Sequence, residues 1–189
     1  MVADFELKKL VKPLQDWFDG HARVLPWRDD PKAYKVWISE IMLQQTRVEA
    51  VKPYFARFME ALAACPEDRY LKLWEGLGYY NRVRNLHAAA EQIMEQYGGT
   101  IPDTVEELLR LKGIGSYTAG AIASIAYNRP VPAVDGNVLR VISRVLADRE
   151  DIRQPSVKAR MERELKEIMP RERTSQYNQG LIEVGAIVC

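Results

Sequence analysis

Two segments of this sequence share one pattern, and it constrains the fold more than any other feature. They are LKLWEGLGYYNR, residues 71–82, and LLRLKGIGSYTA, residues 108–119. Each has a helix-like run, then Gly-x-Gly, then a tyrosine at the same offset. Because glycine adopts positive φ and often ends helices, each segment predicts a helix, a tight turn and a second helix. One Gly-x-Gly is only a common helix break, whereas two in matching context favour a specific structural unit.

The rest of the chain is also helical in pattern. Apolar residues recur at helical spacing, and no run alternates in the β-branched manner of a strand. The capping patterns Thr46-x-x-Glu49, Asp103-x-x-Glu106 and Thr104-x-x-Glu107 predict where two of the helices begin. The sequence therefore predicts an all-α protein of roughly ten helices. The expected helices cover residues 4–19, 35–43, 46–59, 67–75, 79–97, 104–112, 116–127, 135–147, 156–168 and 174–188.

Composition narrows the class of protein. The 189 residues suffice for one domain or two small lobes, and the net charge of +1 is low for a dedicated polycationic binder of nucleic acid. Any contact with DNA must therefore rest on local placement of charge. No apolar run approaches the roughly 20 residues of a membrane span, and the N-terminus does not resemble a signal peptide. We expect a cytoplasmic protein whose two cysteines, Cys65 and Cys189, are reduced.

The second Gly-x-Gly, Gly113-Ile114-Gly115, precedes a helix expected to begin at Ser116. The backbone N–H groups at a helix start, together with the helix dipole, bind anions. A DNA phosphate is the natural anion for such a turn, and this contact would be independent of DNA sequence. The alternative is a plain helix break.

Two carboxylates are candidates for chemistry. Asp135, in VDGNVLRV, has the sequence context of a helix N-cap, where helix N–H groups would hold it ionised. Glu40, in WISEIMLQQT, lies in an apolar segment; it points either to solvent or inwards, where burial would favour its protonated form. One ionised and one protonatable carboxyl group form the pair that cleaves glycosidic bonds through oxocarbenium-like states.

Several motifs in order resemble a known family, the helix-hairpin-helix DNA glycosylases, and within it the adenine glycosylases that act opposite 8-oxoguanine. They are LPWR, WISEIMLQQT, GLGYYNRVRNL, LKGIGSYTAGAIASIAY, VDGNVLRV and YNQGLIEVGAIVC, which together cover nearly all of the chain. The resemblance implies two helical lobes with the active site in the cleft between them. It divides the chain into an N-terminal helix packing with the C-terminal helices (1–27), a helical lobe containing the helix-hairpin-helix (28–132) and a return to the second lobe, cut off before the iron–sulfur loop (133–189).

The resemblance also implies roles for individual residues. Glu40 would be the acid that protonates N7 of the extruded adenine, and Asp135, organised by Asn137, would stabilise the sugar cation. Tyr117 matches a tyrosine at the sugar. Trp27, Arg28, Leu43 and Glu183 would line the adenine pocket, and Gln44 and Tyr79 would insert into the duplex. An enzyme that acts on a stacked base must extrude it, and something must fill the gap. The turn residues Gly113, Gly115 and Ser116 would hold the DNA phosphate.

Tyr117 stands where strand-cleaving relatives carry a lysine that forms a Schiff base with the sugar. A phenol cannot form one, so the resemblance implies base removal without strand cleavage. Thymine-mismatch glycosylases also tend to have tyrosine here, so the choice of adenine rests on Glu40. Two alternatives stay open: a thymine or uracil mismatch glycosylase, and a helix-hairpin-helix DNA-binding module without catalysis.

The resemblance implies a [4Fe–4S] cluster in full-length members, held by four cysteines of which Cys189 matches the first. One cysteine cannot hold the cluster, and the family's 8-oxoguanine-reading C-terminal domain has no counterpart in these residues. We therefore expect a catalytic core without the cluster. We also expect it to act as a monomer on double-stranded DNA with A:8-oxoG or A:G mismatches, at the nucleoid of a bacterium and not at a membrane.

Overall fold

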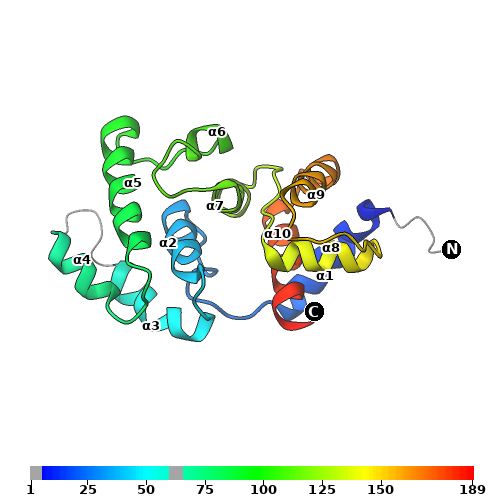
Figure 1. Cartoon of the computed structure of the whole chain (residues 1–189), viewed down its shortest axis with the longest axis horizontal. Helices are drawn as coiled ribbons and strands as arrows, with labels where there is room; N and C mark the ends of the chain where they lie inside the picture. Colours follow the sequence, from blue (N-terminus) through cyan, green and yellow to red (C-terminus); the bar gives the residue numbers. More distant parts are fainter. Residues whose placement is uncertain (1–5, 60–65) are drawn as a thin grey trace. The chain divides into compact units, whose positions relative to one another are not determined.

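The computed structural model describes residues 6–59 and 66–189, and throughout these ranges it contains helices and no strand, which confirms the all-α prediction (Figure 1). None of the described helices is long and apolar enough to cross a bilayer. Residues 4 and 5 of the first expected helix, and Cys65, lie outside the described residues. The elements are η1 (Leu7–Leu10), α1 (Val11–His21), α2 (Ala33–Leu43), α3 (Val48–Met59), α4 (Glu67–Trp74), α5 (Asn81–Tyr97), α6 (Val105–Leu108), α7 (Ser116–Ala121), η3 (Ile122–Ala126), α8 (Gly136–Val145), α9 (Pro155–Ile168) and α10 (Thr174–Ile187).

The chain folds into two compact units. The terminal unit combines the chain up to Arg23 with Ala123–Cys189, and the central unit is Val24–Ile122. These boundaries lie four and ten residues before the 27/28 and 132/133 positions that the family resemblance implies. Each unit has its own hydrophobic core, and each is described here by itself.

Helix α2 is the buried centre of the central unit, where it packs against α3, α5 and α7. Every residue from Val36 to Met42 is buried, so no face of that stretch reaches solvent. A helix covered on all sides belongs to a core. This settles the orientation that the sequence left open for Glu40: its carboxyl lies inside the unit, and the residue is only 9% exposed.

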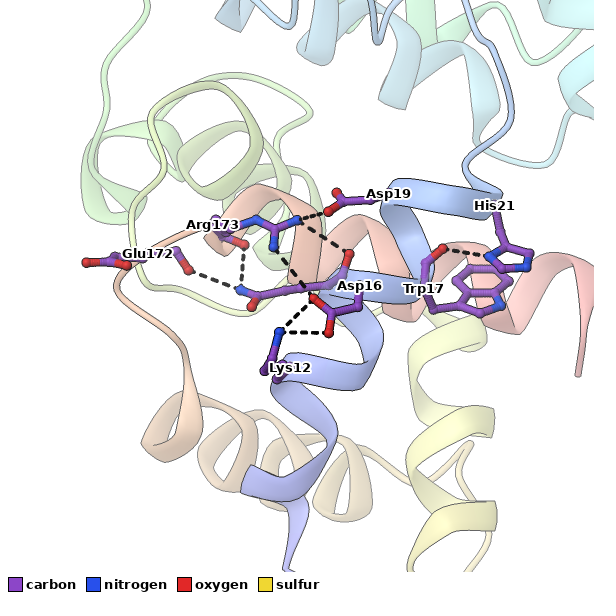
Figure 2. Close-up of polar contacts among 8 residues, drawn as sticks. Lys12, Asp16, Trp17, Asp19, His21, Glu172 and Arg173 are labelled. Atoms are coloured by element: carbon purple, nitrogen blue, oxygen red, sulfur yellow. Dashed lines mark hydrogen bonds and ion pairs between the residues drawn. The ribbon is translucent and has the colours of Figure 1, made fainter.

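Helix α10 lies at the centre of the terminal unit, where it packs against α1 and α8. A polar contact joins α1 to the start of α10: the Gln15 side chain donates to the carbonyl oxygens of Glu172 and Arg173, each at 3.1 Å. The Arg173 guanidinium reaches back to Asp19, with Asp16 at 3.9 Å (Figure 2). These bonds bring together two segments that are far apart in the sequence.

Several helix boundaries differ from the sequence prediction by a few residues, and three of these differences have a local explanation or alter the helix type. Thr104 does cap α6, accepting from the Glu107 N–H at 3.3 Å, but that helix ends at Leu108 and does not reach residue 112. The helix from Ser116 is α-helical only to Ala121 and continues as a π-helix. Helix α3 begins at Val48 because the Thr46 hydroxyl does not cap it; this hydroxyl instead donates to the Gln44 carbonyl at 3.3 Å.

Candidate active site

The strongest candidate for chemistry in the central unit is the pair Glu40 and Tyr117. Glu40 lies on α2 and Tyr117 is the second residue of α7, and the packing of these helices brings together residues 77 positions apart. The Tyr117 hydroxyl donates a hydrogen bond to Glu40 Oε2 at 2.7 Å. A buried carboxyl group held by a phenol is fixed in direction, which a general acid requires.

The turn before α7 is built for close backbone approach. Gly113 has φ +76°, and a Cβ there would lie 2.7 Å from Asn85 Cβ, so only glycine fits. Ile114 anchors the turn with a buried side chain, and Gly115 is the N-cap of α7 without a side chain to cap it. This geometry suits the predicted phosphate contact of Gly113, Gly115 and Ser116, which stays a prediction.

Asp135 is the N-cap of α8 in the terminal unit, as its sequence context indicates. Its Oδ1 accepts from the Val138 N–H at 2.9 Å, and its Oδ2 accepts from the Asn137 side-chain amide at 2.7 Å. Both oxygens are therefore oriented by donors. The predicted association of Asn137 with Asp135 corresponds to this direct hydrogen bond.

Arg140 extends this arrangement and was not singled out from the sequence. Its guanidinium donates to Asn137 Oδ1 at 2.8 Å and to the carbonyl oxygen of Gly185 on α10. Because Asn137 Oδ1 accepts from Arg140, its amide nitrogen must face Asp135. The spacing of three residues between Asn137 and Arg140 on one helix was the available signal.

Gly185 lets α10 approach α8 at this point. A Cβ on Gly185 would lie 2.6 Å from Asn137 Cβ and 2.8 Å from the Asn137 carbonyl oxygen. We expect Gly185→Ala to force the helices apart and lower the free energy of unfolding by about 1–3 kcal/mol, the usual effect of overpacking. Urea unfolding followed by circular dichroism measures this change.

Gly20→Ala is the matched control, because Gly20 lies in α1 and nothing lies within 4 Å of its Cβ position. We expect this control to be neutral or to stabilise by at most about 1 kcal/mol, since alanine is the better helix former. Equal stabilities for the two variants would show that Asn137 and Gly185 are not in close contact.

Glu183 is completely buried in the terminal unit and is paired with Arg23. Arg23 Nε donates to Oε1 at 2.6 Å, its terminal nitrogen to Oε2 at 2.9 Å, and its backbone N–H to Oε1 at 3.1 Å. Such a two-pronged ion pair is among the strongest side-chain contacts, and it fixes the glutamate carboxylate. Arg23 is a second partner that sequence reasoning missed, because the two positions are 160 residues apart.

The remaining predicted residues lie in the central unit. Trp27 is buried against Phe55, with ring centroids 5.3 Å apart, while Arg28 and Leu43 are partly exposed. Gln44 and Tyr79 line a pocket of about 290 Å³, so the structure does bring the two predicted duplex-inserting residues together. Glu183, Asp135 and Asn137 belong to the terminal unit. The grouping of all these residues around one nucleotide stays a prediction.

The [4Fe–4S] cluster stays an expectation for full-length members of the family that the motifs resemble. Cys189 is exposed and forms no disulfide, and within residues 6–59 and 66–189 no three His, Cys, Asp or Glu side chains gather as metal ligands would. A cluster with four thiolate ligands needs more cysteines than the two in this sequence. The chemistry of Glu40, Tyr117 and Asp135 does not depend on such a cluster.

Comparison with known proteins identifies the family. Residues 38–171 match the model of the HhH-GPD superfamily base excision DNA repair proteins. The chain belongs to this superfamily. Among curated proteins, this HhH-GPD chain is 41% identical over 191 residues to an adenine DNA glycosylase of Mus musculus, 38% over 210 residues to one of Schizosaccharomyces pombe and 40% over 191 residues to one of Homo sapiens.

These alignments cover 93%, 97% and 93% of the chain but only 37%, 46% and 35% of the relatives, so the chain spans less than half of their length. Solved structures show the same HhH-GPD fold. A thermostable thymine-DNA glycosylase superimposes with a TM-score of 0.81 at 24% identity, over 95% of this chain and 86% of the other. Endonuclease III, in a non-covalent complex with DNA, gives 0.79 at 23% identity, over 99% and 87%.

Proposed function

We propose that this chain is the catalytic part of an adenine DNA glycosylase that removes adenine paired with 8-oxoguanine or guanine and leaves the strand uncut. The observation that carries the proposal is the hydrogen bond between Tyr117 and the buried carboxyl of Glu40. The pair puts a carboxylic acid that would protonate the leaving base beside a phenol. The phenol stands at the position where a strand-cleaving enzyme needs an amine. The adenine DNA glycosylases of mouse, human and fission yeast, at 38–41% identity, support the choice of adenine.

In the proposed reaction, Glu40 donates its proton to N7 of the extruded adenine, so the base leaves as a neutral species. The electrons of the breaking C1′–N9 bond go to the base, and the sugar becomes an oxocarbenium-like cation. The ionised Asp135 carboxylate, oriented by Asn137 and the Val138 N–H, stabilises that cation. A water, or Asp135 as a transient adduct that water then hydrolyses, completes the replacement of adenine by hydroxyl, and the proton that the water loses restores the Glu40 acid.

DNA binding would use backbone features more than net charge, because the chain carries a formal charge of only +1. The Gly113–Gly115 turn and Ser116 at the start of α7 would hold a phosphate. Gln44 and Tyr79, at the 290 Å³ pocket, would occupy the space left by the extruded base. The Tyr79 side chain is 64% exposed and is therefore accessible to a DNA base.

The proposal is tested by incubating the protein in excess with duplexes that contain A:8-oxoG, A:G, T:G or U:G, and by separating base release from strand cleavage with and without alkali. We expect adenine release from the first two duplexes, and breaks only after alkali. Release of thymine or uracil instead would support the mismatch alternative. Binding without release of any base would support a non-catalytic module, and breaks without alkali would contradict the role given to Tyr117.

A further inference from the structure

Arg82, at the start of α5, is turned inwards and joins two loops. One terminal nitrogen donates to the carbonyl oxygens of Ile41 and Met42, each at 3.0 Å, and to that of Gln44. The other donates to the Thr46 hydroxyl at 3.2 Å and to the carbonyl oxygens of Leu77 and Gly78, at 3.0 and 3.2 Å. Residues 41–43 form the end of α2 and residues 44–46 the loop that follows it, while residues 77–80 belong to the loop between α4 and α5. A single guanidinium therefore binds the backbone of both.

The 41–46 contacts satisfy a need of α2. The last carbonyl groups of a helix have no partner within it and carry the negative end of its dipole, so a cation there is favourable. Arg82 supplies that cation to Ile41 and Met42. Its burial lowers the pKa of the guanidinium below the ordinary value, as expected for a group taken out of water.

Each loop also contains a strained residue. Gln45 has φ +56° and Tyr79 has φ +49°, which place both in the left-handed region that residues other than glycine rarely adopt. Such a conformation is unfavourable by itself and persists where surrounding contacts over-determine it. The contacts of Arg82 with the Gln44 and Gly78 carbonyl groups lie directly beside these residues. Its guanidinium also lies 5.4 Å from the centre of the Tyr79 ring.

The two loops form the walls of one pocket. Its lining is Gln44, Gln45, Tyr79, Tyr80, Asn81 and Arg82. Gln44 and the exposed side chain of Tyr79 thus line the same pocket, and Arg82 binds the backbone of both loops. An arginine whose two terminal nitrogens already donate to protein oxygens has little capacity left for a DNA phosphate.

We propose that Arg82 is a positioning residue that locks the Gln44 and Tyr79 loops into one rigid wedge for base extrusion. This inference rests on the proposed function, because it assigns the two loops to the duplex. Arg82 acts through the loops and not by touching DNA, so its loss should reduce extrusion without removing a phosphate contact.

The test compares wild type with Arg82→Met on an A:8-oxoG duplex that carries 2-aminopurine beside the target adenine. The fluorescence of 2-aminopurine rises when its neighbour leaves the stack. We expect Arg82→Met to lose most of this rise and to slow adenine release roughly 10- to 100-fold, the scale of a small misplacement. Titrations of an undamaged duplex at several salt concentrations should give the wild-type slope of log K against log[salt]. A slope smaller by about 0.9 would mean that Arg82 contacts a phosphate and would overturn the proposal.

Arg84→Met is the matched control, since it removes the same charge from an exposed position on the same helix and should leave the extrusion signal unchanged. Thermal unfolding identifies temperatures at which all variants are folded. A double-mutant cycle isolates positioning from general stability: Gln44→Ala and Tyr79→Ala should be coupled in extrusion with Arg82 present and additive in Arg82→Met. Additivity in both backgrounds would overturn the proposal.

The outcomes also separate this inference from the proposed function. A wild-type chain that extrudes the base but releases no adenine contradicts the glycosylase and leaves the wedge supported. An Arg82→Met variant with the wild-type fluorescence rise contradicts the wedge and leaves the glycosylase supported. A wild-type chain with neither a rise nor release of adenine contradicts both, and release of adenine without any rise contradicts the wedge alone.

Discussion

Glu40→Gln should slow single-turnover release of adenine by roughly 100-fold or more, the scale of a general acid. Glutamine has nearly the same shape, and its carbonyl oxygen can still accept the hydrogen bond that Tyr117 donates at 2.7 Å. The buried packing of α2 should therefore survive, while the proton for adenine N7 is lost. Rates on an A:8-oxoG duplex, with circular dichroism to verify the fold, measure the effect.

Two further variants give a smaller expected effect and a control for Glu40→Gln. Tyr117→Phe keeps the acid but removes the donor to Glu40, so its loss of rate should be smaller than that of Glu40→Gln. Glu95→Gln makes the same chemical change at an exposed position of α5 and should leave the rate unaltered. A Glu40→Gln enzyme with a near-normal rate would remove Glu40 from the mechanism and, with it, the main reason to choose adenine.

Asp135→Asn should also slow adenine release by roughly 100-fold or more, because the sugar cation would lose its nearby negative charge. The fold should tolerate the change, since asparagine and aspartate are equally good N-caps. Asn137 Oδ1 accepts from Arg140, so the Asn137 amide nitrogen would face residue 135 as before. The Asn137 amide would lose its acceptor only if the side-chain nitrogen of the new Asn residue turned towards Asn137, at a cost of about 1 kcal/mol.

Asp148→Asn is the control for this prediction. Asp148 follows α8 and pairs with Arg160, and the N–H of Glu150 and this arginine together hold the pKa of the Asp148 carboxyl below its usual range. Its substitution should lower stability modestly, as for other ion pairs near the surface, and leave the rate of base release unchanged. Comparable loss of rate in Asp135→Asn and Asp148→Asn would indicate a general effect of charge or stability and not a role at the sugar.

Local sequence patterns predicted local structure well. The helical periodicity indicated the all-α fold, the VDGN context indicated that Asp135 caps α8, and Thr104-x-x-Glu107 indicated the start of α6. These features depend on contacts within a few residues. The capping pattern at Thr46 failed, because the Thr46 hydroxyl donates to the Gln44 carbonyl and accepts from Arg82, which is distant in sequence. A local pattern could not include that competitor.

The sequence by itself determined which elements form and which chemical groups they carry: a helix–Gly-x-Gly–helix turn, an N-cap carboxylate, and a glutamate in an apolar segment. Only the tertiary structure decided what those groups face. The burial of α2 on all sides turned Glu40 inwards to Tyr117, and the close approach of α8 and α10 at Gly185 placed Arg140 behind Asn137. Arg82 and Arg23 became structural for the same reason. In the sequence alone, each arginine has many possible partners. Only the packing of distant segments selects the oxygen atoms that its guanidinium binds.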